Sequence, residues 1–347
     1  MTRFVPNFST QQLLPPWVSL DARNWVFLIQ VPPETLKTYL DTHFNCAAPD
    51  LAPYYYEPVD FPYGVLRVTR HDNFSSSYGG VAGSQTLRKI DVNWAFPVNR
   101  WQVSPGNMRY SKQLVWIEPM AFDNNSYSMF SSREIWGTEV DMAHIHVEEG
   151  NDPNHMHIDV AAQGLVTFDP KSLSHLIGIM HIELNPKTDI DLGRLMDTHK
   201  GLASFIGLVF ASIGLKGNDD GKHASEVNTL KQFRDVFNMQ VAVYRAIIAS
   251  RADQTNVSDV KFYDGCDVSL DFMWSASMAE ALKGLFFGQD FVLPAHSPFG
   301  HPGRGHAIDR QPVDWNLPRL RKEVVVAASY TSNIRYDVTG TLHTYGR

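Results

Sequence analysis

Short stretches in which apolar and polar residues alternate recur along most of the chain. Many of them carry β-branched or aromatic residues, and a period of two in such residues predicts strands. The strands predicted in this way cover 26–31, 65–69, 90–96, 114–117, 143–147, 155–161, 244–250, 268–272, 324–329, 334–338 and 341–345. Turn-forming residues fill the interval Glu148–Asn154, which predicts a hairpin, and Thr339-Gly340 is predicted to join the last two strands.

The longest apolar run, Gly201–Leu215, has a different period. Its bulky side chains recur every three or four residues, which predicts a helix with one bulky face. The run is shorter than the roughly 20 residues that span a bilayer, so we expect a helix that is buried or lies at an oligomer interface. A second helix is predicted over 277–287. Because no composition shift or internal repeat divides the chain, we expect one β-rich α+β domain.

Composition limits the partners that the chain can have. It contains 37 acidic and 30 basic residues, and the net charge of -7 argues against nucleic acid, whose phosphates require clustered Lys and Arg. The two cysteines, Cys46 and Cys266, cannot form a disulfide scaffold. The N-terminal segment lacks the apolar core of a secretory signal. We therefore expect a cytoplasmic protein that binds a small molecule and neither nucleic acid nor a membrane.

The most informative segment is Phe122–Val147. Within it, Arg133-Glu134-Ile135-Trp136-Gly137 resembles the signature of the acetoacetate decarboxylase superfamily, in which Gly-Arg-Glu-Ile-Trp-Gly stands ahead of a pair of lysines. Two other regions, Gln30–Leu36 and Asp91–Val98, are similar to further strands of that family. The resemblance covers roughly residues 15–295.

The resemblance implies an α+β, β-rich fold, namely an antiparallel β-cone or barrel with peripheral helices. It further implies that residues 1–347 form a single domain, with a helical insertion at about 190–225 and a C-terminal extension at about 295–347. Members of the family are oligomers, so we expect a homo-oligomer.

The family's chemistry uses a buried lysine that forms a Schiff base with a ketone, and this chain departs from that pattern. The alignment places Val140 where the lysine stands and Asp141 where its cationic neighbour stands. Gln30 occupies the position of an early arginine, and Leu66 lies near that of a second glutamate. Because none of these side chains can form an imine, we expect no Schiff-base catalysis; Lys89 is the nearest alternative amine.

These replacements predict an acidic pocket that requires no cofactor. Carboxylates crowded in an apolar cavity raise each other's pKa, which suits them to proton transfer. We assign that role to Asp91, Glu139 and Asp141. The alternative is that Glu139 and Asp141 point outward into solvent.

The resemblance implies a second set of positions that contact the substrate, which are Gln30, Leu66, Arg133, Glu134 and Val140. Within this set we favour a structural role for Arg133 and Glu134, as a buried ion pair that orients the strand.

Four histidines form a second candidate site. His144 and His146 alternate on one strand of the predicted hairpin, and His155 and His157 alternate on the other. If the four converged, their imidazoles would suit Zn, Fe or Ni. The alternative, which we favour, is an ordinary polar face of the hairpin, because the His-x-His pattern has low specificity.

The leading hypothesis is a lyase or isomerase that acts on a metabolite bearing a carbonyl or hydroxyl group. Two other hypotheses stay open: a non-catalytic small-molecule binding protein with the same fold, and a metal-dependent enzyme that uses the hairpin histidines.

Overall fold

In the computed structural model, the described part of the chain is mostly strand. It comprises residues 13–46, 53–61, 63–76, 86–149, 155–186, 190–199, 201–212, 225–234, 242–293, 308 and 312–345. Parts of the predicted hairpin turn (150–154), insertion (213–224) and extension (295–307 and 309–311) lie outside the described residues. The division into a single domain with an insertion and an extension stays a prediction.

The first of two sheets closes into a barrel. Within the described residues its nine strands lie in the order β2 (Tyr54–Pro58), β4 (Thr86–Val103), β3 (Tyr63–Ser76), β1 (Trp17–Gln30), β14 (Val324–Tyr345), β11 (Ala242–Asp264), β10 (Ser225–Arg234), β5 (Arg109–Asp123) and β6 (Val140–Met142). Strand β4 also pairs with β5, and this contact closes the barrel. Pairing is antiparallel except between β5 and its neighbours β10 and β6, which are parallel to it.

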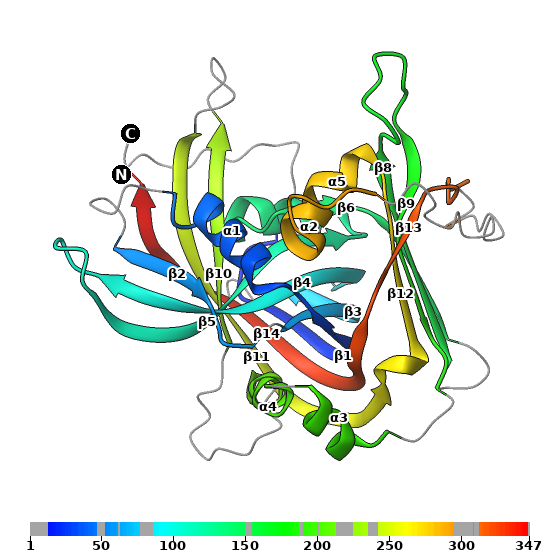
Figure 1. Cartoon of the computed structure of the whole chain (residues 1–347), viewed down its shortest axis with the longest axis horizontal. Helices are drawn as coiled ribbons and strands as arrows, with labels where there is room; N and C mark the ends of the chain where they lie inside the picture. The colour runs from blue at the N-terminus through cyan, green and yellow to red at the C-terminus, as the bar shows by residue number, and fades with distance from the viewer. Residues whose placement is uncertain are drawn as a thin grey trace.

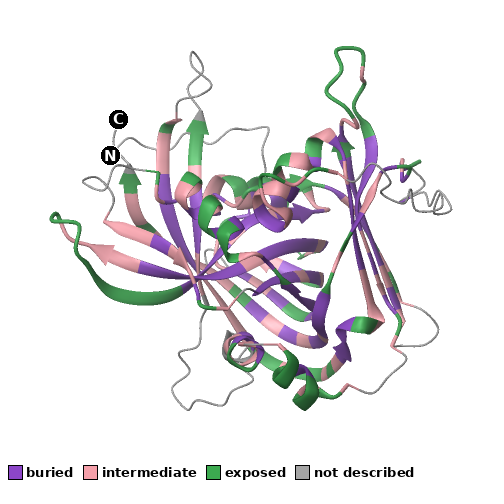
Figure 2. Ribbon diagram, viewed as in Figure 1, coloured by how far each residue is buried: buried purple, intermediate pink, exposed green. Residues whose placement is uncertain are grey.

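The second sheet packs against one side of the barrel (Figure 1). Its strands lie in the order β13 (Arg319–Lys322), β12 (Val268–Met273), β9 (His175–Leu184), β8 (Met156–Gly164) and β7 (His144–Glu149). Strands β7 and β8 pair as the predicted hairpin. The main hydrophobic core lies between the two sheets, where the strands are buried along most of their length (Figure 2).

Helices lie at the periphery, as predicted. They are α1 (Pro33–His43), α2 (Ser126–Ser131), η2 (Ser132–Trp136), α3 (Leu192–Thr198), α4 (Leu202–Ser212), η3 (Gly265–Asp267), α5 (Ala276–Leu282) and η4 (Lys283–Phe287). Helix α4, at the bottom of the barrel in Figure 1, buries the bulky face that the sequence predicted, with Leu202, Phe205 and Val209 packed against strands β1, β3 and β5. Among the helices that the structure describes, none is long and apolar enough to cross a membrane.

Strand β4 shows how the alternating sequence is used. Val92, Trp94 and Phe96 point out of the barrel into the core between the sheets, and all three are fully buried. Lys89 and Asp91, which alternate with them, point into the barrel together with Asn93 and Ala95. Successive side chains of a strand face opposite sides, so an apolar outer face leaves a polar row inside.

The C-terminal strands differ from the prediction. The three short strands expected after residue 324 form one strand, β14, which lies between β1 and β11 in the middle of the barrel sheet. Thr339-Gly340 does not form the predicted hairpin. The strand continues through both residues, and its register against β11 shifts on each side of Gly340. Such bulges are common at glycine, which tolerates the local backbone conformation.

The close contact between η3 and β14 predicts a stability effect. A Cβ atom on Gly265 would lie 1.9 Å from the main-chain oxygen of Val324, so Gly265→Ala forces the backbone to move. We expect a loss of about 1–3 kcal/mol in the free energy of unfolding, measured by urea denaturation. Gly106→Ala is the control, because nothing lies within 4 Å of its added Cβ, and it is expected to change the value by less than about 0.5 kcal/mol. Equal effects of the two substitutions would contradict the prediction.

Candidate functional site

A cavity of about 130 Å³ lies inside the barrel. One part of its wall is polar and is formed by Arg67, Lys89, Asp91, Asn93, Glu118 and Asp123. Another part is aromatic and is formed by Trp17, Phe74, Trp116, Trp136, Tyr330 and Tyr336. The cavity is therefore amphipathic, with charged groups held beside large apolar rings.

The Lys89 ammonium is the centre of the polar wall. Its Nζ atom lies 2.7 Å from Asp91 Oδ2 and 3.2 Å from Asp123 Oδ2. It also lies 4.6 Å from the centroid of the Phe74 ring, a cation–π distance. Asp91 Oδ2 accepts a second hydrogen bond, from His71 Nε2 at 2.9 Å. Strands β3, β4 and β5 are thus connected by one buried cluster of charges.

This cluster sets the protonation states of its members. Burial alone would lower the pKa of Lys89, but Asp123 and Asp91 outweigh burial and raise that pKa above its ordinary value. Burial opposes ionisation of Asp91, yet Lys89 and His71 outweigh it and hold the Asp91 pKa far below its usual range. Burial lowers the pKa of His71. Near neutral pH the cluster therefore contains an ammonium, a carboxylate and a neutral imidazole.

Arg67 and Glu118 form a second pair on the wall. Arg67 Nη2 lies 3.5 Å from Glu118 Oε1, and Arg67 Nε donates to Asn93 Oδ1 at 3.2 Å. Burial raises the pKa of Glu118, and the nearby Arg67 offsets only part of that effect. Glu118 consequently holds its proton to a higher pH than an exposed glutamate does, which is the property required of a group that exchanges protons near neutral pH.

Three residues on the wall each carry a buried polar atom without a hydrogen-bond partner among the described residues. The atoms are the acceptor Asp91 Oδ1, the donor Trp136 Nε1 and the hydroxyl oxygen of Tyr330. A buried polar group without a partner costs about 1–3 kcal/mol, and such groups in native proteins commonly mark a site for water or a ligand. The wall therefore carries one acceptor, one donor and one hydroxyl group that can act as either.

Two of the site residues predicted from the sequence lie on the cavity wall. Asp91 belongs to the charge cluster, and Val140 lines the cavity at the start of β6. Glu139 and Asp141 flank Val140, but both are exposed, and Asp141 has 73% of its side chain accessible. Neither lines the cavity, contrary to the prediction: Asp141 follows Val140 in β6, where alternation turns it away, and Glu139 precedes the strand. Partial removal from solvent nevertheless raises the pKa of Glu139, and Asp141 adds to the rise.

The remaining predicted contact residues lie elsewhere. Gln30 is exposed at the end of β1, and Leu66 is fully buried in the core between the sheets. Arg133 and Glu134 do not form the predicted buried ion pair. Arg133 is 57% exposed and lies 3.8 Å from Asp141, while the Glu134 main-chain oxygen accepts a hydrogen bond from Lys231.

The cavity is also not acidic, contrary to the prediction. Its charged lining residues are three cations, Arg67, Lys89 and Arg251, and three carboxylates, Asp91, Glu118 and Asp123. Arg67 and Glu118 were not predicted as cavity residues, although the sequence pattern could have indicated them. Arg67 and Glu118 are charged residues inside otherwise apolar strands, and each occupies the face opposite the apolar row. Assigning Leu66 in place of Arg67 is a shift of one residue, which reverses the face of a strand.

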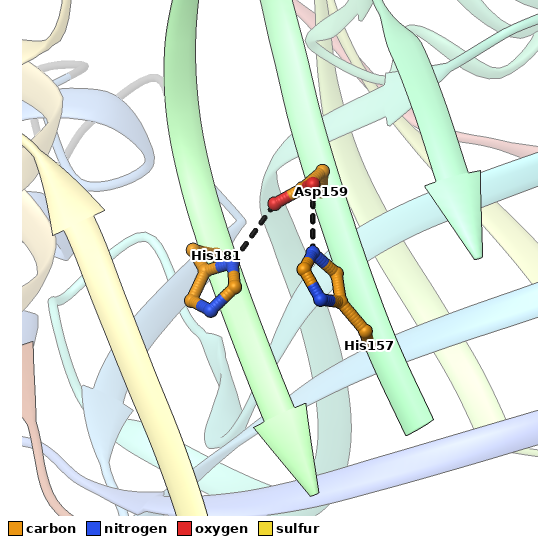
Figure 3. A group of neighbouring side chains, drawn as sticks. All are labelled: His157, Asp159 and His181. Carbon is orange, nitrogen blue, oxygen red and sulfur yellow. Dashed lines mark hydrogen bonds and ion pairs between the residues drawn. The ribbon is translucent and has the colours of Figure 1, made fainter. Parts of the chain in front are cut away.

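The four histidines proposed as an alternative metal site do not converge. Across the hairpin His144 is paired with Ala161, whereas His157 is paired with Glu148. At about 3.4 Å per residue, the rows containing His144 and His157 are roughly 14 Å apart. His157 instead lies beside Asp159 and His181, a histidine of β9 that the sequence pattern did not indicate (Figure 3).

No family model and no curated protein matches the chain. Solved structures do match. An acetoacetate decarboxylase-like enzyme from Sphingomonas wittichii RW1 is 10% identical, covers 99% of this chain and 99% of its own, and gives a TM-score of 0.53. The enduracididine biosynthesis enzyme MppR, complexed with the condensation product of pyruvate and imidazole 4-carboxaldehyde, is 10% identical, with a TM-score of 0.50 over 94% of this chain and 88% of its own. The chain has the acetoacetate decarboxylase-like fold, as its motif predicted.

The charge cluster predicts a pH-dependent stability effect. Lys89→Met leaves Asp91 and Asp123 buried without their cation, and we expect a loss of about 3–5 kcal/mol in the free energy of unfolding at about pH 7. In the variant the native carboxylates bind protons more readily than the unfolded ones do. Lowering the pH to about 5 is therefore expected to recover part of the loss.

Urea denaturation at both pH values measures this effect. Lys171→Met is the control, because Lys171 is exposed, and it is expected to change the free energy by less than about 0.5 kcal/mol at either pH. A loss in Lys89→Met that is the same at both pH values would contradict the assignment of a buried ammonium.

Proposed function

We propose that the barrel cavity is the active site of a lyase or isomerase that acts on a small metabolite bearing a carbonyl or hydroxyl group. The observation that carries the proposal is the set of unpartnered buried atoms on the wall, Asp91 Oδ1, Trp136 Nε1 and the Tyr330 hydroxyl, in a cavity that Glu118 also lines. A hydroxyl group of the substrate would donate to Asp91, and a carbonyl oxygen would accept from Trp136.

The size and character of the cavity support a small amphipathic substrate. Its volume of about 130 Å³ favours a small molecule as the ligand. The aromatic wall would pack the carbon skeleton, and the charged wall would hold its polar end. One of the proteins with the same fold, MppR, is complexed with a condensation product of pyruvate, which supports a carbonyl compound as ligand.

Glu118 is the group that we assign to proton transfer. Its raised pKa suits an acid or base working near neutral pH, and Arg67 at 3.5 Å holds the carboxyl in place. Negative charge that develops on a substrate oxygen would be stabilised by the fixed cations Arg67 and Lys89. Asp91 positions Lys89 and accepts a hydrogen bond from substrate, but its low pKa makes it a poor proton donor.

An imine mechanism has little support from these groups. A lysine that forms a Schiff base must lose its proton readily, which requires a lowered pKa. The pKa of Lys89 is raised instead, because two carboxylates lie within 3.2 Å of its Nζ atom. The position that the resemblance assigns to the family's lysine is the apolar Val140, which lines the cavity.

The second candidate function is binding without catalysis. It is favoured by the internal pairing of Lys89, Asp123 and Arg67, whose charged groups already have protein partners. The homo-oligomer expected from the resemblance stays a prediction in either case.

Trapping with borohydride tests the absence of an imine. We expect no mass increase when the protein is reduced in the presence of an α-keto acid or a β-keto acid, because the Lys89 ammonium is not nucleophilic. A lysine-dependent decarboxylase treated in parallel verifies that trapping works. An adduct on the wild-type protein that disappears in Lys89→Arg would overturn the proposed mechanism.

Substitution of Glu118 tests its role in proton transfer. A panel of carbonyl and hydroxyl metabolites is screened by ligand-induced thermal shift and then for turnover by NMR. With a substrate found in this way, we expect Glu118→Gln to lower kcat by roughly 10²- to 10⁴-fold while the affinity changes little, because the amide keeps the shape of the side chain. Glu139→Gln and Asp141→Asn are controls on the exposed surface and should leave turnover unchanged. Ligands that bind without being converted would instead favour the non-catalytic function.

A further inference from the structure

The second sheet carries a polar group on the face that points away from the barrel. Its inward face supplies apolar side chains, among them Ile158, Val160 and Ile182, to the core between the sheets. The outward residues of the three neighbouring strands lie opposite one another in two adjacent rows. The first row contains His146, Asp159 and His181, and the second contains Glu148, His157 and Glu183.

Three of these side chains are already directed toward one another (Figure 3). His157 Nε2 donates to Asp159 Oδ2 at 2.7 Å, and His181 Nδ1 donates to Asp159 Oδ1 at 2.8 Å. The two imidazole rings meet edge to face, with their centroids 4.6 Å apart. The Asp159 side chain is only 5% exposed, whereas those of His157 and His181 are 23% and 20% exposed. The Asp159 carboxylate is thus buried and held by two hydrogen bonds, whereas the two imidazoles are partly accessible to solvent.

We propose that His157, Asp159 and His181 form a binding site for a divalent transition metal ion, for which Zn²⁺ is the reference. Two imidazoles and one carboxylate are a ligand set typical of such ions, with a water molecule in the remaining position. Ligand atoms about 2.0–2.2 Å from a tetrahedral ion lie roughly 3.3–3.5 Å from each other. The ligand atoms of the three residues all lie within 4.8 Å of one another, so side-chain adjustments on fixed strands are sufficient.

The surrounding charges favour a cation. Glu148 and Glu183 are the partners of His157 on the two neighbouring strands, and both add negative charge beside the site. The basic side chain of Arg321 is bound to Asp271 by contacts of 2.8 and 2.9 Å and also interacts with Glu183, so one cation faces the carboxylates of Glu148, Asp159, Glu183 and Asp271. A metal ion would therefore enter a region of net negative charge.

This site is independent of the proposed enzyme activity. Its ligands lie on the outer face of the second sheet, and none of them lines the barrel cavity. An ion held by His157 and Asp159 of β8 and His181 of β9 would cross-link these two strands. Because an ion that binds only the native state stabilises it, metal binding should raise the melting temperature.

Isothermal titration of the untagged, EDTA-treated protein with Zn²⁺ tests the proposal. We expect one equivalent to bind, together with a Zn²⁺-dependent rise in melting temperature. Asp159→Asn and His181→Ala should each lower the affinity by more than the roughly 10- to 100-fold that loss of an outer partner costs. His175→Ala, an exposed histidine of the same strand β9, is the matched control and should leave the affinity unchanged.

Further measurements test the proposal even if one of the variants does not fold. Melting curves of the metal-free proteins identify any variant that does not fold, and Co²⁺ added to the wild-type protein should produce the visible absorption of a low-symmetry site with nitrogen ligands. A double variant His144→Ala/His146→Ala should retain the bound ion. Absence of Zn²⁺ binding by the wild-type protein, or loss of binding in this double variant with retention in His181→Ala, would overturn the assignment.

Discussion

The Lys89 ammonium lies between the carboxylates of Asp91 and Asp123, and the interior of the barrel is organised around this contact. Charges removed from water are tolerated only when they are paired, because an unpaired buried ion costs several kcal/mol. The pairing therefore requires β4 and β5 to keep one register, and it requires His71 of β3 to supply its hydrogen bond to Asp91. The same requirement keeps the ammonium protonated and so limits the chemistry that the cavity can perform.

The barrel interior can hold a polar cluster because the main hydrophobic core lies outside it. The strands that face the second sheet direct Leu66, Val92, Trp94 and Phe96 outward, and the core lies between the two sheets. A second apolar cluster lies where helix α4 meets inward-facing residues of the barrel, among them Val26, Val65 and Trp116. Burial of apolar surface at both places stabilises the fold, and the remaining inward positions hold the charged groups and further aromatic rings that line the cavity.

The comparison with solved structures shows a shared architecture at 10% identity. The position that the sequence resemblance assigns to the Schiff-base lysine holds Val140, which lines the cavity. The cavity contains positive charge, which Arg67 on β3 and Lys89 on β4 supply. Both are paired with carboxylates, and this pairing favours electrostatic stabilisation and proton transfer over attack by a free amine.

The sequence by itself determined the strand-rich character of the chain, the hairpin of β7 and β8, the buried helix α4 and, through its Arg-Glu-Ile-Trp-Gly motif, the fold. It also indicated Asp91 and Val140 as cavity positions. Alternation states which residues share a face of a strand, but it does not state which face is inside a closed barrel or which strands are neighbours. Only the tertiary structure therefore decided that Arg67, and not Leu66, lines the cavity, and that Glu139 and Asp141 do not. It also brought His181 of β9 beside His157 of β8.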